Sequence, residues 1–163
     1  MPGIELLRAQ RDELDSIENL MQFYLYDFSE WLPLTLAERG LFTVQLPPDY
    51  WRKPATQPFL IRVDGALAGF VTVDDTAHLA GVEFNISYLF VSRRYRGQGV
   101  GCHVVDALLH QLPGCWQVFH LDANQAAKAF WARVVPTLGA SELSQHRLPV
   151  DGYPCTLFKF RIH

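Results

Sequence analysis

One short run constrains the fold of this chain more than any other. It is RGQGVG, at residues 96–101, and it stands between a predicted strand and a predicted helix. Three alternate glycines let the backbone turn tightly and approach a ligand closely, because no Cβ atoms intervene. The first N–H groups of the helix have no partner within the helix, and the helix dipole adds positive charge there. The run therefore predicts a site for an anion such as a pyrophosphate.

Two well-known phosphate loops do not fit this run. The Rossmann pattern needs glycine at its first, third and sixth positions, and counting from Gly97 the sixth position is Cys102. A Walker loop needs Gly-Lys-Ser/Thr, which is absent. An ordinary glycine-rich turn without a ligand remains an alternative.

Hydrophobic periodicity predicts strands and helices along the whole chain. Apolar residues at helical spacing predict helices at residues 13–29 and 99–112, with a shorter one at 34–41, and Asn124 is expected to cap another at 125–135. Strand formers predict strands at residues 4–8, 59–63, 67–73, 82–91, 116–122, 140–148 and 155–162. This order favours an α+β fold, with a mixed and mostly antiparallel sheet flanked by helices on both faces.

Two local details of the sheet can also be predicted. Asp64-Gly65 lies between two predicted strands and is a strong hairpin signal, because both turn positions favour positive φ. Side chains alternate along a strand, so one face of the strand at 82–91 is expected to carry these residues: Phe84, Ile86, Tyr88 and Phe90.

The composition limits the class of protein. The chain has 163 residues, of which 49% are apolar, so we expect one globular domain over residues 1–163. A net charge of −3 gives no global positive field for nucleic acid or a membrane surface, and no stretch predicts a membrane span. The three cysteines lack metal-binding spacing and no signal peptide is recognisable, so we expect reduced thiols, no metal and a cytoplasmic location.

Two motifs give the chain a resemblance to a known family. The run at 96–101, after a long strand, resembles the Gln/Arg-x-x-Gly-x-Gly/Ala signature of the GNAT N-acetyltransferases. The run NQAAKAFW, at residues 124–131, resembles the family's Asn followed by Ala and an aromatic pair. The order of elements is similar over nearly the whole chain, and residues 23–29 resemble bacterial members of unassigned substrate. The resemblance implies the GNAT fold, acetyl-CoA as acyl donor and transfer of an acetyl group to an amine.

The resemblance also implies where the donor binds. Backbone groups of the long strand would pair with the pantetheine arm as with an added strand, and a β-bulge would part that strand from its neighbour. The implied donor site consists of Leu89, Phe90, Val91, Arg96, Gly97, Gln98, Gly99, Val100, Gly101, Cys102 and Asn124. Asn124 acting only as a helix cap remains an alternative.

The catalytic groups follow less directly. The family's usual general acid is a tyrosine at the second aromatic position of the later motif, and here that position is Trp131. An indole N–H cannot protonate a leaving thiolate. We therefore expect Tyr88, Tyr24 or solvent to act as the general acid. An alkylammonium, with a pKa of about 10.4, must lose a proton before it attacks. Glu83 and His120 are the first candidates for the base.

The acceptor is expected to contact the end of the first helix. The residues expected to line its pocket are Tyr24, Tyr26, Asp27 and Trp31. The main hypothesis is an N-acetyltransferase, monomeric or homodimeric, that acetylates a primary amine of a small molecule or peptide in a ternary complex. An acyl-CoA sensor without catalytic activity, suggested by Trp131, and a nucleotide-binding module are the alternatives.

Overall fold

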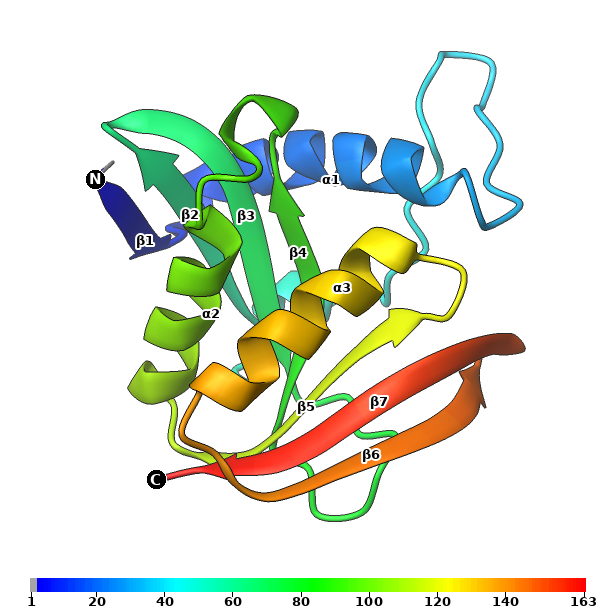
Figure 1. Cartoon of the computed structure of the whole chain (residues 1–163). Helices are drawn as coiled ribbons and strands as arrows, with labels where there is room; N and C mark the ends of the chain where they lie inside the picture. Colours follow the sequence, from blue (N-terminus) through cyan, green and yellow to red (C-terminus); the bar gives the residue numbers. More distant parts are fainter. Residues whose placement is uncertain (1–2) are drawn as a thin grey trace.

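A mixed seven-stranded sheet forms the centre of the molecule (Figure 1). The computed structural model describes residues 3–163. The strands are β1 (Ile4–Arg8), β2 (Gln57–Val63), β3 (Ala66–Asp74), β4 (Phe84–Val91), β5 (Gly114–Leu121), β6 (Ser141–Val150) and β7 (Tyr153–Ile162). Their order is β1-β2-β3-β4-β5-β7-β6. Only the β4–β5 pair is parallel, so the predicted mixed, mostly antiparallel sheet is confirmed.

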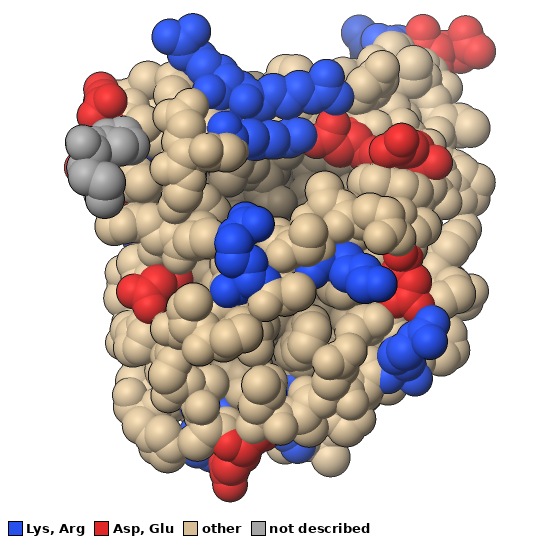
Figure 2. Space-filling model, in the orientation of Figure 1, with Lys and Arg blue, Asp and Glu red and all other residues tan. Residues whose placement is uncertain are grey.

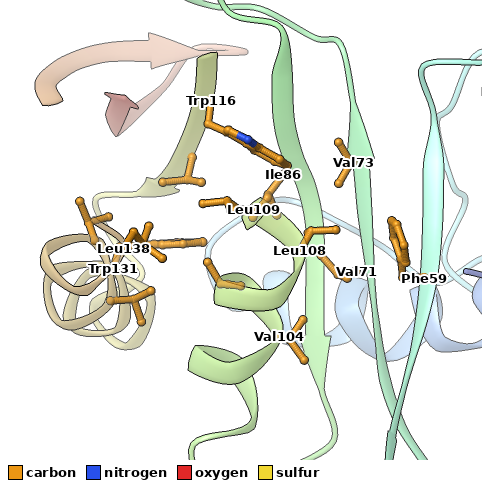
Figure 3. Close-up of a cluster of buried hydrophobic side chains, with 14 of the residues drawn as sticks. Phe59, Val71, Val73, Ile86, Val104, Leu108, Leu109, Trp116, Trp131 and Leu138 are labelled. Carbon is orange, nitrogen blue, oxygen red and sulfur yellow. The ribbon is translucent and has the colours of Figure 1, made fainter. Parts of the chain in front are cut away.

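Helices cover both faces of this sheet (Figure 1). They are α1 (Leu14–Phe28), α2 (Val100–Gln111) and α3 (Gln125–Val134). The main core lies between the sheet and α2 and α3, and Leu108, Trp116 and Trp131 all belong to it (Figure 3). A smaller core lies under α1, where Ile17 and Met21 are buried against β2, β3 and β4. Each fully buried large apolar side chain contributes about 1.5–3 kcal/mol, so both faces of the sheet help to hold the fold.

The hairpin between β2 and β3 forms where the sequence predicts it. Asp64 has φ of 49° and Gly65 has φ of 83°. Positive φ at both turn residues matches the right-handed twist of the two strands, so this prediction is confirmed.

A bulge in β4 changes the faces that its side chains reach. Tyr88 pairs with Thr72 and Ile86 pairs with Val73, so Ser87 is an extra residue without a partner on β3. Such an insertion interrupts the alternation of a strand. Side chains before the bulge therefore pack in the α2–α3 core, whereas Tyr88 packs in the α1 core. The prediction of one shared face is wrong for these four residues: Phe84, Ile86, Tyr88 and Phe90.

The helix expected at residues 34–41 does not form. This segment is a loop closed by an isolated bridge between Leu36 and Phe42. The side-chain amide of Gln22 donates to the carbonyl of Phe42 at 3.0 Å, and its oxygen accepts from the Phe42 N–H at 2.8 Å. The side chain of Gln22, on α1, thus satisfies backbone groups of this loop. The loop therefore needs no helical hydrogen bonds at that point, although its sequence contains apolar residues at helical spacing.

Candidate functional site

The parallel pair formed by β4 and β5 opens into a cleft. β4 and β5 pair at Phe84–Trp116 and Asn85–Gln117, and beyond those residues the two strands diverge (Figure 1). The later part of β4, up to Val91, is thus unpaired on its β5 side and can accept an extended ligand as an added strand. A cleft of about 1100 Å³ lies at this opening. That volume is slightly above the range of about 300–1,000 Å³ that is usual for small-molecule sites, so the cleft has room for a large ligand.

The glycine run forms one end of the cleft. Gly97 has φ of 73° and Gly99 has φ of 80°, so two residues have the left-handed backbone conformation just before α2 begins. Gly99 is the N-cap of α2, and no side chain caps this helix. The first N–H groups of α2 are therefore left open for a ligand, and Val100, Gly101 and Cys102 line the cleft. This geometry fits an anion such as a pyrophosphate.

Gly101 has a further steric role. A Cβ atom placed there would lie 2.7 Å from Cε1 of Phe130 on α3. Only glycine therefore lets α3 approach the first turn of α2 this closely. Phe130 lines the cleft as well, so this contact fixes the wall that faces β4.

Positive side chains gather around the hollow. Figure 2 shows Lys and Arg side chains on both sides of a depression in the surface. Arg93, Arg96 and Arg133 line the cleft. Asp27 at the end of α1 holds two of them, with its carboxylate 2.8 Å from the Arg96 guanidinium and 3.5 Å from that of Arg93. Arg96 also donates to the carbonyl of Val91 at 2.6 Å. Asp27 therefore ties α1 to the glycine run.

The end of α1 and the following turn form another wall. Tyr24, Tyr26, Asp27 and Trp31 all line the cleft. Burial raises the pKa of Tyr24 well above its usual value, and the nearby Tyr88 makes a smaller contribution in the same direction. Its phenol is therefore protonated at neutral pH and can act as a hydrogen-bond donor in the cleft.

His120, on β5, lines the opposite side of the cleft and is 6% exposed. Its Nδ1 lies 2.9 Å from the carbonyl of Leu121. This contact favours the tautomer with the proton on Nδ1, which leaves Nε2 as an acceptor. Asn124 lies close by, and its side chain accepts a hydrogen bond from the Ala127 N–H at 3.0 Å, so it caps α3 as well as lining the cleft.

The structure brings most of the predicted donor residues together. Those that line the cleft are Leu89, Phe90, Val91, Arg96, Gly97, Gly99, Val100, Gly101, Cys102 and Asn124. Gln98 does not line it, because its side-chain amide turns back to donate to the carbonyl of Arg94 at 2.9 Å.

Two of the predicted catalytic residues lie outside the cleft. Glu83 precedes β4 at the far end, where its carboxylate accepts from the Cys115 N–H at 2.9 Å and approaches Arg161. We therefore withdraw Glu83 as a candidate base. The ring of Tyr88 packs edge-on against Tyr24 on the α1 side, and burial raises its pKa to about 12. Tyr88 is not among the lining residues either.

Sequence reasoning missed several lining residues, among them Ser87, Phe119 and Arg133. Ser87 reaches the cleft only because of the bulge, and Phe119 only because β5 diverges from β4. Neither feature leaves a signal in the local pattern of residue types. Trp131 also lines the cleft, but it is 5% exposed and belongs to the main core.

The described residues give no sign of a metal site or a membrane span. Among residues 3–163 no three His, Cys, Asp or Glu side chains are grouped so as to hold a metal ion. Within the same residues no helix is long and apolar enough to cross a membrane.

The sequence model of the acetyltransferase (GNAT) family matches residues 15–135. This match spans well over half of the chain, so the protein belongs to the GNAT acetyltransferase family. Curated protein sequences contain no match to it.

Solved structures share the same fold. An acetyltransferase of the GNAT family from Bacillus cereus is 14% identical, with a TM-score of 0.63 and 99% of each chain covered. The ribosomal-protein-S18-alanine N-acetyltransferase from Escherichia coli is 15% identical, with a TM-score of 0.59 and coverage of 98% of this chain and 94% of that one. The ribosomal L7/L12 alpha-N-protein acetyltransferase, in complex with coenzyme A, is 16% identical, with a TM-score of 0.60 and coverage of 98% and 93%.

Proposed function

We propose that residues 1–163 form a single N-acetyltransferase domain, which moves an acetyl group from acetyl-CoA to a primary amine of a small molecule or peptide. The observation that carries this proposal is the continuity of one cleft. It runs from the open N–H groups of α2, along the unpaired edge of β4, to the parting of β4 and β5. An anion site next to an open strand edge suits a ligand that has a pyrophosphate followed by an extended amide chain.

The chain's own groups would position this donor. The N–H groups around Gly99 and at the start of α2 would hold the pyrophosphate, with Arg133 on the facing wall. Backbone groups between Leu89 and Val91 would pair with the amides of the pantetheine arm. This arrangement would bring the thioester to the bulge at Ser87, where β4 and β5 diverge.

Two side chains in the cleft suit the proton transfers. His120 presents Nε2 as an acceptor and would take a proton from the ammonium, directly or through water. Tyr24 is the one tyrosine of the two predicted candidates that lines the cleft, and its phenol would donate a hydrogen bond to the leaving thiolate. A thiolate has a pKa of about 8.5, so a strong acid is not needed.

The first test compares ligands by their effect on thermal unfolding. Acetyl-CoA should raise the melting temperature, whereas ATP and NAD should not, because they lack the extended amide arm. Stabilisation by ATP or NAD without stabilisation by acetyl-CoA would point instead to a nucleotide-binding module.

The second test concerns turnover. Release of free CoA thiol is measured with acetyl-CoA and a panel of amines, amino acids and peptides. Release that depends on an amine supports the transferase. Tight binding without turnover across the whole panel would favour an acyl-CoA sensor, which is the role that Trp131 in the usual tyrosine position suggests.

A further inference from the structure

A network of buried polar side chains lies directly behind the bulge of β4. At its centre is Asp74, at the end of β3, which is 5% exposed. Its carboxylate accepts hydrogen bonds from the Tyr50 hydroxyl at 2.5 Å, the Asn85 side-chain amide at 3.0 Å and the Thr76 N–H at 3.1 Å. None of the salt bridges formed by residues 3–163 includes Asp74. Burying a carboxylate without a cation costs stability, because its charge loses the stabilisation that water gives. We therefore asked which other group interacts with this charge.

The network is oriented toward this negative charge. The side-chain amide of Gln117 on β5 donates to the Asn85 oxygen at 3.0 Å, and Asn85 in turn donates to Asp74. All three contacts at Asp74 are made by donors, so its oxygens act only as acceptors. Burial and then the hydrogen bond to Asp74 raise the pKa of Tyr50, so its phenol stays protonated.

Ser87 connects this network to the cleft. It is the extra residue of the bulge, and it lines the cleft. The Ser87 hydroxyl donates to the carbonyl of Thr72 at 3.0 Å, and its oxygen lies 3.1 Å from the Tyr50 oxygen. Tyr50 has a single hydroxyl hydrogen, and it is engaged with Asp74 at the shorter distance. Because the Ser87 hydrogen is engaged with Thr72, lone pairs of the Ser87 oxygen remain available to the cleft.

We propose that Ser87 Oγ accepts a hydrogen bond from the attacking amine nitrogen, while the carboxylate of Asp74, held behind the bulge by Tyr50, stabilises the positive charge that this nitrogen gains. The inference rests on the proposed function of the cleft. Ser87 is the residue that touches the acceptor, and Tyr50 and Asp74 are positioning residues. A fixed negative charge favours a nitrogen that becomes cationic and disfavours an anionic nucleophile such as a thiolate, so the network selects amines over thiols.

The protons and bonds of the step balance between the two substrates and solvent. The ammonium first loses one proton, through His120 or water, to solvent. The neutral nitrogen then forms a C–N bond with the acetyl carbon, and the C–S bond breaks. The second proton leaves the nitrogen and ends on the departing thiolate, which gives the free thiol.

The test uses the full chain with acetyl-CoA and three probe amines: tyramine, spermidine and a tetrapeptide of alanine. The kcat and KM are measured from thiol release, and acetyl-CoA affinity is measured separately for every variant. Ser87→Ala, Tyr50→Phe and Asp74→Asn should each lower kcat by at least roughly 10-fold. The first removes the acceptor for the nitrogen, the second removes a hydrogen bond that holds Asp74, and the third removes the negative charge. Affinity for acetyl-CoA should not change.

Two further variants separate this role from a structural one. Ser87→Thr keeps the hydroxyl and should retain most of the kcat that Ser87→Ala loses. Asp64→Asn removes a carboxylate from the β2–β3 hairpin and should behave as the wild type.

Two results would overturn the inference while leaving the proposed function intact. One is a wild-type kcat in both Tyr50→Phe and Asp74→Asn. The other is a loss of kcat matched by an equal loss of acetyl-CoA affinity, which would indicate a structural role. If the wild type binds acetyl-CoA but acetylates neither these probes nor any member of the broader panel of amines, amino acids and peptides, the proposed transfer itself fails, and the role of Ser87 fails with it.

Discussion

Substitution of Gly99 tests the anion site with few confounding effects. Its φ is 80°, and a Cβ atom placed there meets no atom within 4 Å. In Gly99→Glu the new side chain meets no atom, but it stands on a residue whose backbone keeps a left-handed conformation. This strain lowers the free energy of unfolding by about 1–2 kcal/mol. It also places a carboxylate at the start of α2, where the pyrophosphate is proposed to bind.

The expected loss of binding is much larger than the loss of stability. Each hydrogen bond from an N–H to a charged oxygen contributes about 1.5–3 kcal/mol. If the new carboxylate replaces two such bonds, acetyl-CoA affinity should fall by about 3–6 kcal/mol, or roughly 10²–10⁴-fold. Isothermal titration with acetyl-CoA measures this directly.

The hairpin provides a matched control. Gly65 has φ of 83° and equally open surroundings, so Gly65→Glu carries the same backbone strain and the same charge. Both variants should lose several degrees of melting temperature, at about 2–4 °C per kcal/mol for a chain of this size. Only Gly99→Glu should lose affinity. Equal acetyl-CoA affinity in the two variants would refute the assignment of the anion site.

Three further outcomes are expected. Gly101→Val should destabilise the fold by about 1–3 kcal/mol in urea unfolding, because the new side chain would overlap the ring of Phe130. Asp27→Asn should change stability by less than about 1 kcal/mol, yet strengthen acetyl-CoA binding in titrations at low salt, since it removes a negative charge held against two arginines of the cleft. Above pH 10 an unfolded tyrosine ionises while Tyr88, with its pKa raised to about 12, does not. Stability should therefore fall as the pH rises from about 10 to about 12, and less steeply in Tyr88→Phe, when unfolding is followed by circular dichroism.

The sequence predicts the local elements well where local forces decide them. Asp64-Gly65 turns as expected, because its φ angles are set by the hairpin itself. Asn124 caps α3, and the glycine run at 96–101 leads into α2, for equally local reasons. The predicted helix at 34–41 does not form, and local sequence cannot show why. The side chain of Gln22, on α1, bonds both backbone groups of Phe42, the residue that follows this segment.

The candidate site is predictable only in part. The residues proposed to bind the donor follow one another along the chain, so a motif indicates nearly all of them. The positions of the side chains proposed for catalysis depend on the bulge at Ser87 and on the divergence of β4 and β5, which are properties of the assembled sheet. Glu83 is the clearest failure: strand alternation gives it a polar face, but it lies at the end of β4 opposite the cleft. Asp74 and Tyr50 meet across 24 residues, and no pattern of spacing indicates that contact.

Mass spectrometry of the products tests the central claim most directly. The protein is incubated with acetyl-CoA carrying a ¹³C-labelled acetyl group and with a mixture of primary amines and peptides. The proposed function predicts that the label appears on an amine nitrogen in step with the release of free CoA thiol. Label that stays on acetyl-CoA, or appears only as free acetate, while the protein binds acetyl-CoA tightly, would contradict an amine acetyltransferase.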